Sequence, residues 1–179
     1  LVIGGTGPTG PFIVRGLLER GHRVAMLHTG RHEVAEIAEH VEHVHVDPYD
    51  GEALESALRD RRFDLCIATY GRLRRIAEIM QGRCNRFVSV GGGPAYLGYM
   101  NPAWSGPAGM AVPIGEDAPR VTAPAQDEKG YRIARTEDAV FARHPTATHF
   151  RYPIVYGPRQ LMPVEWCIVR RVLLSLIHI

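Results

Sequence analysis

The sequence predicts an α/β domain built on a parallel sheet. Strand-like and helix-like segments alternate along most of the chain, and a glycine-rich turn directly follows the first strand. The segment 63–68 is apolar on both faces, which is typical of buried parallel strands covered by helices on both sides. Strands separated by helices are joined by right-handed crossovers within one sheet.

The elements are expected in a regular order. A strand at 1–4 precedes a helix at about 9–20, and Gly21 ends that helix because glycine readily adopts the left-handed conformation after a C-terminus. Region 91–125 is rich in Gly and Pro and has no strong periodicity, so we expect a substrate-side loop or lid there. Further strands are expected at 22–28, 41–46, 63–68, 86–90 and 148–155, and further helices at about 32–39, 51–59, 72–81, 128–142 and 164–173.

The composition is that of a globular domain with a sizeable core. The 179 residues are 45% hydrophobic, and the formal net charge of +2 points to no particular partner. No apolar run reaches membrane-spanning length. Cys66, Cys84 and Cys167 are odd in number and form no C-x-x-C, which favours reduced thiols, with Cys66 in the core. A cytoplasmic protein without membrane association is therefore expected.

Both ends of the chain suggest a fragment. The chain begins without methionine, inside the first expected strand, and its last six residues read LSLIHI. That hexapeptide resembles the translation of a transposon-end adapter used in DNA library preparation. We therefore interpret 1–173 as a partial nucleotide-binding domain and 174–179 as a non-native tail; a genuine apolar chain end is the alternative.

A Gly-x-Gly-x-x-Gly turn stands between the first strand and the first helix. Glycine lacks a Cβ, so backbone N–H groups there can approach a pyrophosphate closely, and the helix N-terminus adds partial positive charge. The strand–turn–helix setting is the one that dinucleotide-binding turns require, whereas a tight turn without a ligand is the alternative. The cofactor-binding residues expected in this turn are Gly4, Gly5, Thr6, Gly7, Pro8, Thr9 and Gly10.

Two residues after neighbouring strands bear on the choice of cofactor. No acid stands at the end of the second strand to accept from a ribose 2′-hydroxyl, whereas Arg31 can pair with a 2′-phosphate. NADP is therefore favoured as the cofactor, and NAD is the open alternative. Asp47, after the third strand, is expected either to contact the cofactor or to form a turn, and Asp50 to cap the next helix.

Two further clusters are interpreted as ordinary surface. His40, His43 and His45 lie close in sequence, and His43 and His45 share one face of an expected strand. No third ligand stands at a defined spacing from this pair, so a polar strand face is expected rather than a metal site. The basic run at 72–75 has no interleaved aromatic residues, so a solvated helix face is expected and nucleic-acid binding is only a minor alternative.

Tyr131 and Arg135 are spaced four residues apart on an expected helix and so share a face. A nearby cation lowers the pKa of a phenol, which makes the pair a candidate acid/base site. A surface helix pair is the alternative that spacing alone favours.

Five segments of the chain form a recognisable set when taken in order. They are the glycine turn at 4–10, Asp-Pro-Tyr-Asp at 47–50, Arg-Phe-Val-Ser-Val at 86–90, Tyr131-x-x-x-Arg135, and Arg-Tyr-Pro-Ile-Val-Tyr-Gly-Pro-Arg-Gln at 151–160. Together they resemble the extended short-chain dehydrogenase/reductase superfamily, and more narrowly its NAD-dependent epimerase/dehydratase branch, over nearly all of 1–173. The resemblance implies a Rossmann-type, doubly wound parallel sheet, with most of a C-terminal substrate domain missing from this chain.

The resemblance also implies roles for particular residues. Tyr131 takes the position of the tyrosine that exchanges the substrate hydroxyl proton during hydride transfer, and Arg135 stands where the family has lysine. The segment beside the cofactor ribose corresponds to Ala68, Thr69 and Tyr70. The residues expected near the substrate are Tyr96, Tyr156 and Arg159.

Departures from the family pattern leave the function open. The position of the substrate-orienting Ser or Thr falls in Gly91–Gly93, and Ser89 is expected inside a strand. The first hypothesis is an NAD(P)-dependent oxidoreductase or epimerase acting on a sugar-like or other small hydroxyl or carbonyl substrate. A catalytically degraded NADP-binding regulator or sensor is the second, and an RNA-binding relative the third. A homodimer is an open alternative among the partners.

Overall fold

The computed structural model describes residues 1–160 and 165–175 and contains a six-stranded sheet in the order β3-β2-β1-β4-β5-β6. All five strand pairings are parallel. The chain therefore winds outward from β1 in one direction and then from β4 in the other, which confirms the predicted Rossmann-type, doubly wound fold. The strands are β1 (Val2–Ile3), β2 (Ala25–His28), β3 (Glu42–His45), β4 (Phe63–Ala68), β5 (Cys84–Gly92) and β6 (Thr148–Tyr152).

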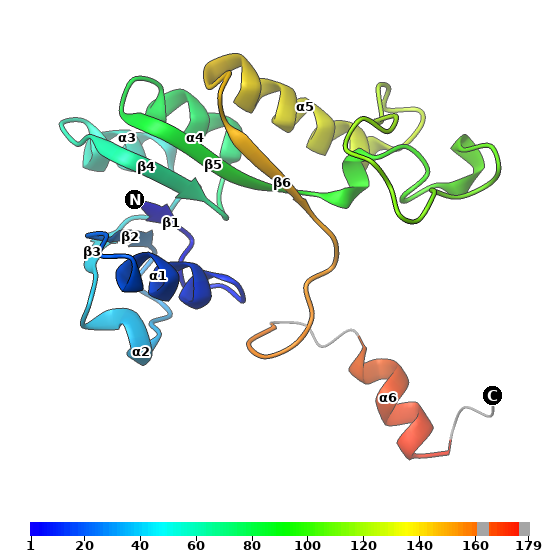
Figure 1. The fold of residues 1–179 in the computed structure, drawn as a ribbon, viewed down its shortest axis with the longest axis horizontal. Coiled ribbons are helices and arrows are strands. Elements are labelled where there is room, and N and C mark those ends of the chain that lie inside the picture. Colours follow the sequence, from blue (N-terminus) through cyan, green and yellow to red (C-terminus); the bar gives the residue numbers. More distant parts are fainter. Residues whose placement is uncertain (161–164, 176–179) are drawn as a thin grey trace.

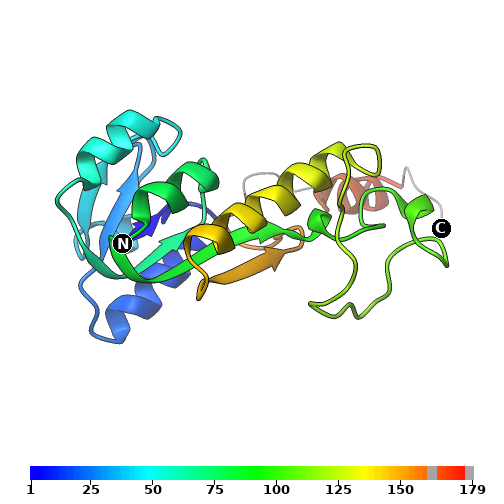
Figure 2. The ribbon, with the colours of Figure 1, turned by 90° about the horizontal axis from the view of Figure 1, so that it is seen from above.

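Helices cover both faces of this sheet (Figures 1 and 2). Figure 1 shows α1 and α2 below the sheet and α3, α4 and α5 above it, while α6 stands apart at the end of the chain. The helices are α1 (Gly10–Glu19), α2 (Ala35–Ala38), α3 (Gly51–Leu58), α4 (Leu73–Met80), α5 (Glu128–Arg143) and α6 (Trp166–Leu173).

The hydrophobic core is divided by the sheet into two clusters. Val2 and Met26 face α1 and α2, whereas their neighbours Ile3 and Leu27 face α3, α4 and α5. Successive strand residues point to opposite faces, so strands buried on both faces need apolar residues at every position. Cys66 is fully buried in the larger cluster, as predicted, and burial raises the pKa of its thiol.

Several element boundaries follow local signals. Gly21 has φ +80°, and its N–H donates to the carbonyl oxygen of Leu18, which confirms the predicted helix end. Asp50 caps α3 by accepting from the N–H groups of Glu52 and Ala53, also as predicted. The predicted strand at 148–155 instead ends at Tyr152, because Pro153 has no N–H to continue the ladder.

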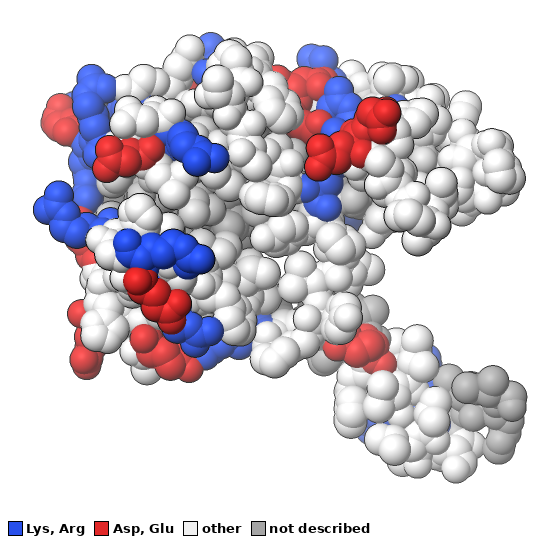
Figure 3. Space-filling model, in the orientation of Figure 1, with Lys and Arg blue, Asp and Glu red and all other residues white. Residues whose placement is uncertain are grey.

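The predicted strand at 86–90 is longer than expected, and the expected loop region is correspondingly shorter. β5 continues through Gly92, because Gly91 and Gly92 pair with Arg151 and Tyr152 of β6. After it, 96–115 contains no Lys, Arg, Asp or Glu. Figure 3 accordingly shows the right-hand edge of the upper body in white, while charged side chains lie at the left and, as a mixed group, to the left of that edge.

The end of the chain packs little against the domain. No residue of α6 is buried. Of the interpreted tail at 174–179, only Leu174 and Ser175 belong to the described residues, and 176–179 lies outside them. Across 1–160 and 165–175, no helix combines the length and the apolar character that crossing a membrane requires.

Candidate functional site

A pocket of about 550 Å³ lies at the carboxyl ends of the strands, where residues following β1, β2, β3 and β4 converge. In doubly wound sheets this edge, at the reversal of strand order, is where ligands bind. The structure thus brings together most of the residues predicted for the cofactor. The predicted residues that line the pocket are Gly4, Thr6, Gly7, Pro8, Thr9, Arg31, Asp47, Thr69 and Tyr70.

The glycines of the turn serve two different purposes. Gly4 has φ +89°, and a Cβ there would stand 2.4 Å from Cβ of Tyr70. A Cβ on Gly10 would stand 2.2 Å from the carbonyl oxygen of Gly5, so both glycines are required by backbone packing. A Cβ on Gly7 would meet only the Gly4 carbonyl oxygen, at 3.7 Å. Gly7 therefore leaves open space on the pocket side of the turn.

Hydrogen bonds hold the turn against the sheet. The Gly4 N–H donates to the carbonyl oxygen of Leu27 at 3.0 Å, and the Gly10 N–H to that of Gly7 at 3.0 Å. The Thr69 hydroxyl lies 3.1 Å from the carbonyl oxygen of Ile3, which ties the end of β4 to the turn. Thr9 is the N-cap residue of α1, but its side chain makes no capping hydrogen bond. The N-terminus of α1 therefore opens onto the turn without a side-chain cap.

Tyr49 and Tyr70 form one wall of the pocket. Their rings meet edge to face with centroids 5.3 Å apart, and about half of each residue is exposed. Burial and the neighbouring Tyr70 raise the pKa of the Tyr49 phenol. Asp47 accepts from the Tyr49 N–H at 2.9 Å, so it forms the turn and also lines the pocket.

The pocket residues that follow β2 are basic and rich in imidazole. Arg31 and Thr29 follow β2 and are exposed, whereas His28 is 4% exposed. Among the described residues that line the pocket, Asp47 is the only acid. Arg31 therefore brings positive charge to the wall at the end of β2, while Glu33, two residues further on, lies 3.6 Å from Nε2 of His45 and does not line the pocket.

The predicted catalytic pair lies elsewhere. Tyr131 and Arg135 line a second groove, of about 620 Å³, between α5 and the start of α4. Arg135 is mostly exposed and lies 3.7 Å from Asp138, and neither member of the pair lines the pocket of the glycine turn. Arg74, from the predicted basic surface, donates across this groove to the Thr136 hydroxyl at 3.0 Å.

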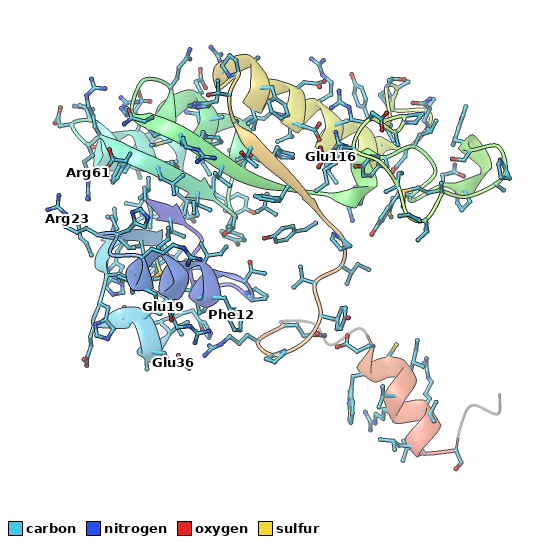
Figure 4. The ribbon with its side chains drawn as sticks, in the orientation of Figure 1. Phe12, Glu19, Arg23, Glu36, Arg61 and Glu116 are labelled. Atoms are coloured by element: carbon cyan, nitrogen blue, oxygen red, sulfur yellow. The ribbon has the colours of Figure 1, made fainter. Side chains whose placement is uncertain are left out.

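The residues predicted near the substrate are also dispersed. Tyr96 is 8% exposed, and the Arg151 guanidinium covers its ring, 4.6 Å from the centroid. Tyr156 is 78% exposed, and Arg159 forms an ion pair with Glu36, which projects from α2 (Figure 4). None of these three residues lines the pocket of the glycine turn.

The position where the family carries Ser or Thr falls in Gly91–Gly93, and the space for a side chain differs between these glycines. A Cβ on Gly91 would stand 2.3 Å from Nε2 of His149, whereas a Cβ on Gly92 would meet nothing closer than Cδ of Pro94 at 3.1 Å. Ser89 lies inside β5 as predicted, is fully buried, and its hydroxyl lies 2.8 Å from Nδ1 of His149. Ala68, predicted beside the cofactor ribose, is buried at the end of β4 in the larger core cluster and does not line the pocket.

Several residues that line the pocket were not predicted from the sequence. Tyr49 and Tyr152 could have been, because they belong to segments that carry the family resemblance. His28 lies in none of these segments, and its place beside His45 depends on how β2 and β3 pair, which the sequence does not specify. The missed residues are His28, Thr29, His32, Pro48, Tyr49, Val90, Tyr152 and Val155.

Comparison with known proteins shows similarity at the level of structure. No protein-family model matches the chain, and no curated protein sequence matches it. The enzyme WbmH of Bordetella bronchiseptica, solved in complex with NAD⁺, superposes with a TM-score of 0.72 at 19% identity, over 97% of this chain and 62% of that one. UDP-glucose 4-epimerase of Thermotoga maritima, solved with UDP-glucose, gives 0.71 at 17% identity over 97% and 62% of the two chains.

A third similar structure is the NAD complex of dTDP-glucose 4,6-dehydratase from Bacillus anthracis. Its TM-score is 0.69 at 16% identity, over 97% of this chain and 61% of that one. This chain thus spans about three fifths of the length of these proteins. The chain therefore shares the Rossmann-type fold of NAD-dependent epimerases and dehydratases, the fold that its sequence motifs predict.

Proposed function

We propose that the chain binds a nicotinamide dinucleotide in the pocket of the glycine turn, as the nucleotide-binding part of an NAD(P)-dependent oxidoreductase or epimerase. The substrate class that we propose is a sugar-like or other small hydroxyl or carbonyl compound. The observation that carries the proposal is the convergence of the glycine turn, Asp47, Thr69 and Tyr70 on one pocket at the switch point of the sheet.

The shape of the turn suits a diphosphate. Open space at Gly7 lets the backbone come close to phosphate oxygens, and the start of α1 contributes its dipole at the same place. The exposed rings of Tyr49 and Tyr70 offer apolar surface to the planar adenine. The similar structures of WbmH and of dTDP-glucose 4,6-dehydratase hold NAD, which supports the same class of ligand here.

NADP is the form that we propose this chain prefers. Arg31 stands at the end of β2, where the family binds the ribose of the adenosine half, and its planar guanidinium suits a phosphate. No carboxylate from the segment after β2 is among the described residues that line the pocket, since Glu33 lies against His45 instead. The charge of this wall thus favours the additional phosphate.

Titration of the 179-residue chain with NADPH and NADH, followed by nucleotide fluorescence, tests the binding proposal. Gly7→Ala places a methyl group where the diphosphate would lie, and we expect it to weaken binding by about tenfold or more while the thermal melt stays unchanged. Gly16→Ala on α1 is the matched control, since its Cβ would meet only the flexible end of Arg20. Undiminished binding by the Gly7 variant would contradict the proposed cradle.

A second function, dinucleotide binding without turnover, is favoured by the position of the expected catalytic residues. Tyr131 and Arg135 line the groove beside α4, and Gly91–Gly93 offer no hydroxyl group at the position where the family carries Ser or Thr. A sensor or regulator would keep the phosphate cradle and lose these groups. Without a hydroxyl donor that stabilises the transition state, the rate would fall by about 10²–10³.

Turnover measurements on the full-length protein, with its substrate domain, separate the two functions, because the present chain spans only about three fifths of the similar enzymes. Hydride transfer monitored as NADPH absorbance, over a panel of nucleotide sugars and small carbonyl compounds, supports the enzyme if any compound is consumed efficiently. Tyr131→Phe then tests the tyrosine: abolished turnover with unchanged NADPH affinity would assign it the proton-transfer role, and unaltered turnover would exclude that role. NADPH binding with no turnover over the whole panel supports the sensor.

A further inference from the structure

Three imidazoles and a carboxylate gather at the edge of the sheet, beside the pocket. The parallel pairing of β2 and β3 sets His28 opposite His45 and Met26 opposite His43. Because these positions share the face covered by α2, the rings of His28, His43 and His45 meet with centroids 4.8 to 5.6 Å apart. Glu33, from the segment before α2, lies 3.6 Å from Nε2 of His45.

We propose that His28, His43, His45 and Glu33 form a binding site for a divalent transition metal of the zinc class. Imidazole nitrogens are the usual protein ligands of Zn²⁺, Ni²⁺ and Cu²⁺, and three of them with one carboxylate complete a tetrahedral set. The sequence pattern argues against a metal, because His43 and His45 lack a third ligand of defined spacing. The fold supplies that ligand, since it brings in His28 from β2 together with Glu33.

The spacing of the ligand atoms is close to what a metal needs. Each of the four residues offers a ligand atom, and these atoms all lie within 4.8 Å of one another. Ligands at about 2.1 Å in a tetrahedron are separated by about 3.4 Å. His28 Nε2 and His43 Nδ1, now 2.8 Å apart, would have to separate slightly, and the wider pairs would have to contract. The side chains of His45 and Glu33 are 53% and 50% exposed and are free to rotate inward.

The hydrogen bonds around the cluster determine which ring nitrogens must carry a proton when a metal binds. Nε2 of His43 lies 2.9 Å from the carbonyl oxygen of Ala38, so its N–H can donate there while Nδ1 faces the cluster. Metal-bound histidines are typically oriented by such a donation from the other ring nitrogen. His28 accepts from the Gly30 N–H at Nδ1 and directs Nε2 toward His43. A metal at Nε2 requires the His28 ring proton on Nδ1, where it would face the Gly30 N–H, so these two groups would have to move apart; Gly30 is exposed, so its N–H could donate to water instead.

Zn²⁺ titration of the 179-residue chain by isothermal calorimetry, without dinucleotide, tests the site. A Cys167→Ser background removes the exposed thiol as a competing ligand. We expect one equivalent to bind, to raise the melting temperature, and to be weakened about tenfold or more by His43→Gln or His45→Gln. His40→Gln is the matched control, because His40 is an exposed histidine of the same segment that lies outside the cluster.

Two further measurements test the metal site even if the histidine variants unfold. Glu33→Gln changes only an exposed side chain, and we expect it to weaken Zn²⁺ binding while the metal-free melt stays the same. Co²⁺ loading is expected to give the strong visible absorption of a tetrahedral complex in the parent chain. Absence of Zn²⁺ binding, binding that survives His43→Gln and His45→Gln, or an octahedral Co²⁺ spectrum would each overturn the proposal.

Discussion

The guanidinium of Arg151 binds both carboxylate oxygens of Glu137. Nε donates to Oε2 at 2.9 Å and an η-nitrogen to Oε1 at 2.6 Å, while Arg120 donates to Oε1 at 3.0 Å. The Glu137 side chain is only 5% exposed, so this ion pair is largely removed from solvent. It joins α5 to β6 and, through Arg120, to the segment before α5. The long connection after β5 is thereby fixed to the sheet.

We expect Glu137→Gln to lower the free energy of unfolding by about 3 kcal/mol. The substitution removes one partner of a buried pair and leaves the charge of Arg151 without its counterion. Urea denaturation followed by circular dichroism measures the effect. Glu128→Gln, at the exposed start of the same helix, is the control and should change stability by less than about 0.5 kcal/mol. Equal effects of the two variants would contradict the structural role of the ion pair.

Stability should decrease as the pH is lowered through the range where histidines titrate. Burial lowers the pKa of His28, with the nearby His45 and His43 adding to the effect, and burial also lowers the pKa of His149 against the opposing charge of Glu137. The unfolded chain therefore binds more protons than the folded chain below about pH 6.5, and the free energy of unfolding falls as the pH decreases.

Denaturation in a chelating buffer between about pH 7.5 and about pH 5.5 measures this dependence. His28→Gln should reduce the slope of unfolding free energy against pH, whereas His22→Gln, at an exposed position, should leave the slope unchanged. If the parent chain and both variants show the same slope of unfolding free energy against pH, His28 does not contribute to the pH dependence.

Glu137 affects stability at a lower pH than the histidines, because hydrogen bonds and charge from Arg151 outweigh burial and hold its pKa below the ordinary value. Its stabilising contribution is lost as the pH falls through that lowered pKa.

Arg31→Ala should alter cofactor preference. If Arg31 pairs with a 2′-phosphate, its loss weakens NADPH binding by about tenfold, which corresponds to about 1.4 kcal/mol, and leaves NADH binding nearly unchanged. Parallel fluorescence titrations with both nucleotides measure the difference. Arg15→Ala, on the exposed surface of α1, controls for the loss of one positive charge. Equal weakening of both nucleotides would show that Arg31 does not recognise the 2′-phosphate.

Gly10→Ala should destabilise the domain even without cofactor. The new Cβ would overlap the Gly5 carbonyl oxygen at 2.2 Å, and both atoms belong to the backbone. We expect a loss of about 1–3 kcal/mol in the free energy of unfolding, more than the gain in helix propensity of about 1 kcal/mol. Gly16→Ala in the same helix should be neutral or stabilising in the same urea titration. A stable Gly10 variant would show that the turn can widen.

The order of elements and the phosphate turn could be predicted because their signals are local. Gly21 ends α1 and Asp50 begins α3 through contacts within a few residues, so each can be recognised from the adjacent sequence. The alternation of strands and helices restricts the topology to right-handed crossovers. The extension of β5 through Gly92 was not predictable in the same way, since it depends on pairing with β6.

Spacing along a helix indicated that Tyr131 and Arg135 share a face, but not which face. The buried positions of α5 include Gly130, Ala134 and Glu137, and their packing turns Tyr131 toward α4. Helix rotation is decided by contacts with distant segments, which periodicity does not specify when polar residues such as Glu137 are buried.

The sequence by itself determined the α/β order, the parallel sheet and the glycine turn, because each depends on conformational preferences of neighbouring residues. Only the tertiary structure decided that His28 and Glu33 join His43 and His45, that Arg151 binds Glu137, and that Tyr131 lies outside the pocket. These relationships join residues distant in sequence, and they are set by strand register and helix packing.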